Sequence, residues 1–310
     1  MSVSTSTVTV HGLVCHRDVD MALVCLGSLL KFSVQPLHLV IHDDGSLTPK
    51  DVEKLLNNLT GSSIIFRHEA DELLNQLLKQ YPNCYNYRYK NVLSLKLLDV
   101  PLLSQSDFAF CDSDILFMQP FEAMFRWFND NTSALFMKDY VDAYSMLPWH
   151  LLGNNKLKLP AKVNSGLIFF RKAAYDLDFV EWFLGQEQFR HKIGWLEQTC
   201  WAALGHRVGC QQWNAEQITL IRPNTSLSNN LVAGHFVKEV RYRLGEFASA
   251  TEALTATKSP VLVETITPPD CNLLELAQLH GMRQLKRVRN YHKIPSIVGK
   301  KFFGSYQQVS

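Results

Sequence analysis

FCDSDILF, residues 110–117, is the stretch that decides the fold. An apolar run that begins at Phe108 ends in two aspartates separated by one residue, Asp112 and Asp114, and a second apolar run follows them. The first run is apolar at every position, which is typical of a central parallel strand covered by helices on both faces. Ligands of such sheets bind outside the carboxyl ends of the strands. The stretch therefore predicts a parallel α/β sheet with two carboxylates at its ligand-binding edge.

The segments upstream alternate between strand and helix patterns. Residues 7–14 have the pattern of a strand, and apolar residues recur at helical spacing over 18–32. Residues 37–42 predict a second strand, and Thr48 followed by Pro49 is typical of a helix start. Shorter patterns predict strands at 63–66, 107–111, 133–137 and 166–171 and helices at about 71–80 and 91–98. Between the last strands, residues 139–162 predict a long loop, which in a compact domain is more often functional than idle.

The composition of the chain changes near residue 245. A polar stretch rich in alanine and threonine follows, and from Leu276 onward there are seven lysines or arginines and no acidic residue. The sequence thus predicts a domain over 1–245, a linker or peripheral loop over 246–272 and a basic tail over 273–310. In the tail, apolar residues recur at helical spacing. Such a helix can pack on the domain or lie on a bilayer with its cations facing anionic headgroups.

The composition excludes several classes of protein. The chain has 310 residues, 46% of them hydrophobic, and a formal net charge of +2. This describes a globular protein without the strong positive field that nucleic-acid binding requires. Seven scattered cysteines without a Cys-x-x-Cys pair fit reduced thiols in a cytosol. The first twelve residues have no basic region and no long apolar run, so we expect neither secretion nor a membrane span.

The two aspartates suggest a metal site. Carboxylates two residues apart can bind a hard divalent cation and leave coordination positions for phosphate oxygens. The alternative is a solvated turn in which Asp112 and Asp114 serve as caps. An exposed turn does not need the long apolar run before it, so the setting favours a metal-bound diphosphate as the ligand.

Several pieces of the sequence, in this order, resemble the GT-A-fold glycosyltransferases that use nucleotide sugars. Besides FCDSDILF and the N-terminal HGLVCHRDVDMALVCLGSLLKFS, the pieces are VIHDDGS (40–46), LSLKLLDVPLL (93–103), VNSGLIFFR (163–171), EQTCW (197–201) and AGHFVKEVR (233–241). The resemblance covers most of residues 7–241 and is closest to the retaining branch typified by glycogenin and bacterial lipopolysaccharide hexosyltransferases. It implies a Rossmann-like, mostly parallel sheet with helices on both faces.

The resemblance also implies a metal and its ligands. Asp112 and Asp114 match the family's metal-binding Asp-x-Asp, and His235 resembles the late histidine that completes the coordination. Mn²⁺ or Mg²⁺ is the implied cofactor, and mixed imidazole and carboxylate ligation suits Mn²⁺ somewhat better. Without the resemblance, His235 would be interpreted as a surface or core histidine.

Further positions match the family's contacts to the donor phosphates and nucleoside. Lys96 occupies the place of a basic residue that faces the donor; the alternative is a lysine that extends to solvent. Asp43 and Asp44 resemble the carboxylates that hold the nucleoside, and their alternative role is turn formation before Gly45.

Positions near the donor sugar also match. Asn164, Ser165 and Gly166 resemble the family's Asn-(Ser/Ala)-Gly, whose polar side chains meet the sugar. Glu197 and Gln198 match the acidic-Gln pair beside the reacting sugar, where the family often has Asp. The alternative for this pair is an exposed helix face, which the flanking tryptophans disfavour.

The late segment departs from the glycogenin-like pattern, which has a Gly and then Lys-Pro after the histidine. Lys238 or Arg241 is expected to neutralise the leaving diphosphate, which departs as an anion. Retention of configuration is the favoured outcome, but Glu197 could also serve as the base of an inverting enzyme.

The sequence thus predicts an enzyme that moves a hexose from a nucleotide diphosphate sugar, with a UDP-sugar favoured, to a hydroxyl of a glycan, lipid-linked or protein acceptor. It predicts no nucleic-acid partner. One alternative is a sugar-phosphate nucleotidyltransferase, but residues 15–20 lack the glycine-rich loop that such an enzyme normally carries. Another is a catalytically silent carbohydrate-binding or scaffolding protein. We expect a cytoplasmic location. If the basic tail binds lipid, the protein would lie peripherally at the inner face of a membrane.

Overall fold

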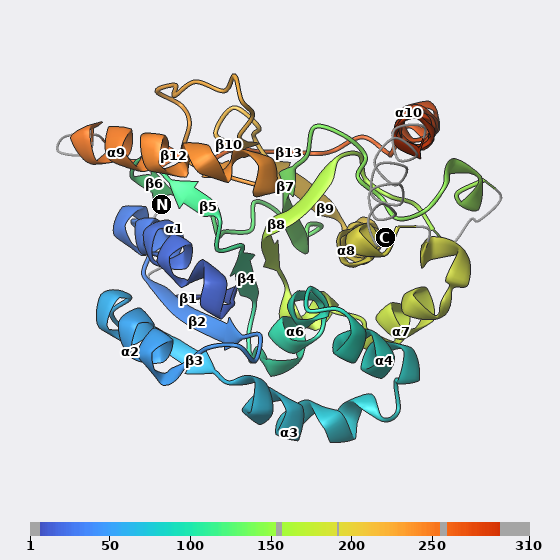
Figure 1. Ribbon diagram of the computed structural model, residues 1–310, viewed down its shortest axis with the longest axis horizontal. Coiled ribbons are helices and arrows are strands. Elements are labelled where there is room, and N and C mark those ends of the chain that lie inside the picture. Colours follow the sequence, from blue (N-terminus) through green and yellow to red (C-terminus); the bar gives the residue numbers. More distant parts are fainter. Residues whose placement is uncertain (1–6, 153–156, 191, 255–258, 292–310) are drawn as a thin grey trace, which may run out of the picture.

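The computed structural model describes residues 7–152, 157–190, 192–254 and 259–291 (Figure 1). A large sheet lies at its centre. Its strands are β1 (Val8–Val14), β2 (Leu37–Asp43), β3 (Ser63–Ile65), β4 (Phe108–Cys111), β7 (Ala134–Lys138), β8 (Val163–Phe170), β9 (Cys210–Trp213) and β13 (Thr265–Ile266). The eight strands follow the order β13-β9-β7-β8-β4-β1-β2-β3. Only β8 and β13 run against the other strands of this sheet, so the mostly parallel sheet is confirmed.

Helices cover both faces of the sheet (Figure 1). One face carries α1 (Val19–Phe32) and α2 (Pro49–Asn58), and the other carries α3 (Arg67–Leu78), α4 (Pro82–Lys90), α5 (Ser94–Leu97), α6 (Asp99–Leu103), α7 (Leu177–Gly185) and α8 (Leu196–Val208). Along β4, Phe108 and Phe110 belong to the apolar cluster of the second face, while Ala109 and Cys111 belong to that of the first. The continuous apolar run before the aspartates is therefore explained by burial on both sides.

A smaller sheet joins the chain that follows the aspartates to a much later segment. It consists of β5 (Ile115–Phe117), β11 (Ala233–His235) and β10 (Ile218–Leu220), with β11 between the other two. Because β11 is antiparallel to β5, His235 lies opposite Ile115, the residue after Asp114. A two-stranded pair is formed by β6 (Phe121–Glu122) and β12 (Val261–Leu262). Short 3-10 helices occur at η1 (His16–Asp18), η2 (Pro148–His150), η3 (Lys172–Ala174), η4 (Glu187–Arg190), η5 (Ile193–Trp195) and η6 (Lys238–Arg243).

The segment expected as a linker or loop is more structured than its composition indicates. Helix α9 (Leu244–Leu254) opens it, and β13 adds an edge strand to the main sheet. The loop interpretation is wrong for these two elements, because Phe247 of α9 is buried against Phe236 and β13 pairs with β9. Small alanine and threonine side chains permit both conformations, and packing selects between them. The boundary at residue 245 stays a prediction.

Helix α10 (Leu273–Tyr291) confirms the helical spacing expected in the tail, and residues 292–310 lie outside the described part of the chain. Leu276 is fully buried in the cluster under α8, and Glu275 pairs with Lys162 at 3.2 Å. The helix therefore packs on the domain, although Met282 and Leu285 are exposed. Among the residues that the structure describes, none of the helices has the length and apolar character needed to cross a bilayer.

Candidate active site

Asp112, Asp114 and His235 converge where β4 ends. The N–H of Asp112 donates to the carbonyl of Gly166 at 2.7 Å, and the N–H of Phe236 donates to the carbonyl of Asp114 at 2.8 Å. These backbone bonds fix the three side chains so that their ligand atoms all lie within 4.8 Å of one another. Nε2 of His235 is 3.0 Å from Oδ1 of Asp114 and 3.7 Å from Oδ2 of Asp112.

The chemistry of this group fits a divalent metal. Two carboxylates and an imidazole are donors that Mn²⁺ accepts, and Mg²⁺ is compatible with the carboxylates. Asp114 and His235 are buried, which excludes a surface histidine and a fully solvated turn. Burial does not separate a metal ligand from a core histidine, so the role of His235 as a ligand stays a prediction. The other ring nitrogen of His235, Nδ1, is buried without a hydrogen-bond partner among the described residues, and Nε2 is the nitrogen that faces the aspartates. A Cβ at Gly166 would lie 2.5 Å from the ring, so only glycine leaves room for the imidazole there.

Each aspartate also has a cationic partner. Nζ of Lys96 lies 3.2 Å from Oδ1 of Asp112, and Nη2 of Arg241 lies 2.7 Å from Oδ2 of Asp114. Lys96 is only 3% exposed, so the alternative in which it extends to solvent is wrong. Lys238 is exposed on η6, and the structure thus brings Arg241, rather than Lys238, to the aspartates.

The pKa values of these side chains reflect this pairing. Burial alone would lower the pKa of Lys96, but the carboxylates of Asp112 and Glu197 outweigh burial and raise it. Burial also opposes ionisation of Asp114, yet His235 and Arg241 outweigh it and lower the pKa of Asp114 to about 2. At Asp112 burial dominates, and the pKa is raised despite Lys96 and His235. The two carboxylates are thus held differently, Asp114 being the more firmly ionised.

Asn164, Ser165 and Gly166 open strand β8 beside this group. Oδ1 of Asn164 accepts from the N–H of Gly166 at 2.9 Å, and its Nδ2 donates to Oδ2 of Asp139 at 3.2 Å. Because β8 is reversed relative to its neighbours, its first residues lie at the edge where β4 and β7 end. Asp139, the residue after β7, was not identified from the sequence as a site residue. Its position directly after a strand was the available signal.

Glu197 and Gln198 lie in the first turn of α8 and are both buried. Ser165 Oγ donates to Oε2 of Glu197 at 3.0 Å, and the N–H of Ser165 donates to Oε1 of Gln198 at 3.2 Å. The alternative in which Glu197 and Gln198 lie on an exposed face of a helix is therefore wrong. Burial raises the pKa of Glu197 to about 7, with Lys96, at 3.9 Å, opposing the shift.

Asp43, the last residue of β2, and Asp44, which follows it, organise a turn. Oδ1 of Asp43 accepts from the N–H groups of Gly45, Ser46 and Leu47, and Oδ1 of Asp44 accepts from the N–H of Ser46. The turn role is confirmed, and Gly45 adopts the positive φ of 100° that this turn requires. The nucleoside contact of both carboxylates stays a prediction.

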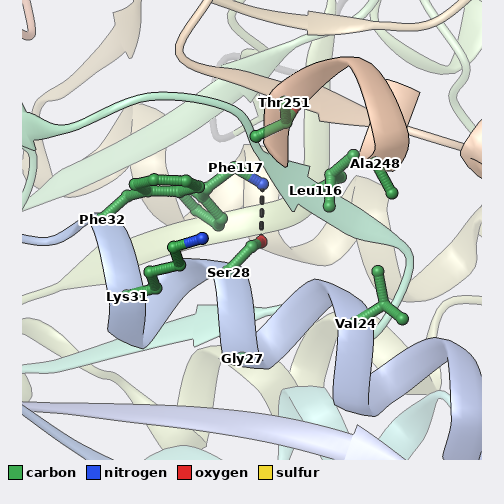
Figure 2. Close-up of a pocket in the computed structure, with 9 residues that line it drawn as sticks. All are labelled: Val24, Gly27, Ser28, Lys31, Phe32, Leu116, Phe117, Ala248 and Thr251. Atoms are coloured by element: carbon green, nitrogen blue, oxygen red, sulfur yellow. Dashed lines mark hydrogen bonds between the residues drawn. The ribbon is translucent and has the colours of Figure 1, made fainter. Parts of the chain in front are cut away.

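An apolar pocket of about 220 Å³ lies between α1, β5 and α9. Figure 2 shows its lining, which includes Val24, Phe32 and Leu116, and the hydrogen bond that Ser28 Oγ accepts from the N–H of Phe117 at 2.8 Å. That bond fixes β5 to α1 and so helps to hold the strand that follows Asp114. No carboxylate of the metal group lines this pocket, so we assign the chemistry to the sheet edge.

Comparisons with known proteins bear on the fold. No family model and no curated protein matches the chain. Among solved structures, mouse xyloside xylosyltransferase 1 in its apo form matches with a TM-score of 0.55 and 12% identity over 76% of this chain and 99% of that one. The apo structure of the bifunctional glycosyltransferase WbbM matches with a TM-score of 0.51 and 10% identity over 83% of this chain and 51% of that one. The chain has the fold of the GT-A glycosyltransferases.

Proposed function

We propose that this protein is a metal-dependent glycosyltransferase that moves a hexose from a nucleotide diphosphate sugar, with a UDP-sugar favoured, to a hydroxyl of a glycan, lipid-linked or protein acceptor. The observation that carries the proposal is the Asp112, Asp114 and His235 group at the carboxyl edge of a GT-A sheet. The two cations beside it, Lys96 and Arg241, are what an anionic diphosphate requires.

Different residues of the site would bind the metal, the phosphates and the nucleoside of the donor. Asp112, Asp114 and His235 would hold Mn²⁺ or Mg²⁺, which when bound neutralises the diphosphate and helps it to leave. Lys96 and Arg241 add positive charge on either side of the ion, and Asp43 and Asp44 would hold the nucleoside. Lys238, exposed on the same 3-10 helix as Arg241, is a second candidate for the departing phosphate.

The sugar would lie against the start of β8 and of α8. Asn164 is held by Asp139 and by the N–H of Gly166, so its amide is oriented before any donor binds. Glu197 and Gln198 are held by Ser165, and Gln198 also donates to the carbonyl of Ala143 at 3.0 Å. Because these hydrogen bonds hold Glu197 and Gln198 in place, the two side chains can stabilise a positively charged sugar. Such stabilisation supports retention of configuration.

A donor screen tests the proposal. UDP- and GDP-sugars are incubated with the protein and Mn²⁺ or Mg²⁺, and release of nucleoside diphosphate is measured, which requires no knowledge of the acceptor. We expect slow hydrolysis of one UDP-sugar that stops when the metal is chelated. Absence of metal-dependent hydrolysis, together with absence of nucleotide binding, would favour the carbohydrate-binding or scaffolding alternative.

A further inference from the structure

The two cations beside Asp112 and Asp114 affect how tightly these carboxylates can bind a divalent ion. Asp112 and Asp114 contribute two negative charges, and Lys96 and Arg241 contribute two positive charges. With His235 neutral, as a metal ligand must be, these five side chains sum to zero. Glu197, with Oε1 3.9 Å from Nζ of Lys96, and Asp18, 3.6 Å from Arg241, lie at the margin of the group and add negative charge when ionised. A divalent ion alone would still place two further positive charges beside Lys96 and Arg241, which a low-dielectric site opposes. The two negative charges of a nucleotide sugar's diphosphate offset the charge of the ion.

Arg241 is the cation that neutralises the carboxylate of Asp114. Its guanidinium donates to Oδ2 of Asp114 through Nη2 at 2.7 Å and through Nε at 3.2 Å. The opposite oxygen, Oδ1, faces His235 and the metal position. The ion and Arg241 would therefore share one carboxylate from two sides, and each weakens the hold of the other through like-charge repulsion.

A second carboxylate keeps Arg241 beside the site. Nη1 of Arg241 lies 3.6 Å from Oδ2 of Asp18, which immediately precedes α1 and is also bonded by Arg17. If the bond to Asp114 lengthens when the ion binds, Asp18 still holds the guanidinium at the edge of the site. The positive charge is thus retained near the phosphates instead of moving into solvent.

We propose that Arg241 couples metal binding to nucleotide binding: it lowers the affinity of the Asp112, Asp114 and His235 group for a free divalent ion and raises it for the ion together with a diphosphate. The inference rests on the proposed function for the identity of the anion. The role of Arg241 in this coupling is argued from its contacts with Asp114 and Asp18.

The test measures Mn²⁺ affinity by electron paramagnetic resonance, with and without UDP, on the full chain. Association of Mn²⁺ with UDP in buffer is measured separately and subtracted. Arg241→Gln should tighten Mn²⁺ binding without UDP by about tenfold, because a like charge near the ion is removed. It should weaken UDP binding in the presence of Mn²⁺, and by linkage the factor by which each ligand improves the other should fall equally for both.

Two further variants separate charge from structure. Arg241→Lys keeps the charge and loses the forked contact, so its Mn²⁺ affinity without UDP should stay near that of the wild type. Arg17→Gln removes a cation from the same neighbourhood, but Arg17 is 78% exposed and does not contact Asp114, so Mn²⁺ affinity should change little. The circular dichroism spectrum and melting temperature of each variant report on folding.

The outcomes separate the inference from the proposed function. If the wild type binds neither Mn²⁺ nor UDP under any condition, the proposed function fails. If the wild type binds both with strong coupling and folded Arg241→Gln shows the same coupling, the function stands and the role of Arg241 is refuted. A loss of Mn²⁺ affinity in Arg241→Gln without UDP would also refute it.

Discussion

Gly166 lies where β8 passes the imidazole of His235. A methyl group there would approach Cε1 of His235 to 2.5 Å and Oδ1 of Asn164 to 2.8 Å, so one of them must move. We expect Gly166→Ala to displace His235, to weaken Mn²⁺ binding at least about tenfold and to destabilise the fold by about 1–3 kcal/mol, as overpacking usually does.

Titration with Mn²⁺ and a urea unfolding curve measure the two effects. Gly194→Ala is the matched control, because a methyl group at Gly194 would have no neighbour within 4 Å and the backbone there has no positive φ. Unchanged Mn²⁺ affinity in Gly166→Ala would contradict the expected displacement of a metal-binding His235.

Asp114 offers a second test at the scale of one residue. Asp114→Asn removes an ionic ligand while keeping the side-chain shape, and Arg241 keeps Asp18 as a partner. We expect metal-dependent nucleotide binding to be lost and the far-ultraviolet circular dichroism spectrum to be retained. Asp20→Asn makes the same charge change at an 85% exposed side chain and should leave binding intact. Near-normal turnover by Asp114→Asn would contradict the metal assignment.

At the scale of the elements, a buried pair of histidines joins β1, β2 and α6. Nδ1 of His11 lies 2.9 Å from Nε2 of His42, and Nε2 of His11 lies 3.0 Å from Oγ of Ser104, which itself donates to the carbonyl of Val100. Because Ser104 uses its proton on Val100, His11 must donate through Nε2 and accept from His42 through Nδ1. Both rings are neutral in this chain of hydrogen bonds.

The pair predicts how stability depends on pH. Burial lowers the pKa of His42 to about 4 and that of His11 well below the unfolded value near 6.5. The unfolded chain therefore binds protons that the folded chain does not, and the free energy of unfolding should fall as pH drops from about 6.5 towards 4, by about 1 kcal/mol per pH unit for each proton.

Urea unfolding at pH 7.5, 6 and 5 measures this slope. In His42→Gln the side chain stays neutral at each pH, so the slope should be shallower than in the wild type, whatever the stability at pH 7.5. Equal slopes for both proteins would exclude His42 as a cause of the pH dependence.

Elements with local signals were predictable from the sequence, and elements set by distant contacts were not. The cap of α2 is local: Thr48 accepts from the N–H of Asp51, and Asp51 accepts from the N–H of Thr48. Helix α4 was not predicted, because its N-terminal N–H groups donate to Glu181 of α7, far along the chain. Asp112 and Asp114 could be predicted as site residues from the apolar run that precedes them. Asp139 could be placed in the site only once the pairing of β7 with β8 was known, because that pairing brings it to Asn164.

At the scale of the whole molecule, α10 decides how the membrane hypothesis can be tested. Leu276 is buried, so removing residues 273–310 would also uncover the domain. Neutralising Lys286, Arg287 and Arg289 to Gln removes tail charge and keeps Leu276. If the tail binds bilayers, the wild type should sediment with anionic liposomes at low salt, and this should fade as salt rises, since each cation near the surface contributes about 1 kcal/mol.

The control neutralises three exposed lysines elsewhere, Lys50, Lys79 and Lys90, and should sediment like the wild type. If the wild type stays in the supernatant at low salt, the tail is structural and the peripheral location is excluded.

The segment from Asp139 to Lys162 begins and ends at the site. The N–H of Asp139 donates to the carbonyl of Lys162 at 2.6 Å, and Asp139 also bonds Asn164. Its two ends are held where β7 ends and β8 begins, and between them Tyr144, Met146 and Leu157 are buried in the core of the domain. New sequence could therefore replace exposed positions such as Trp149 and Leu152 without uncovering the core. If the proposed function holds, changes at such exposed positions would alter the acceptor while leaving Asp112, Asp114 and His235 in place.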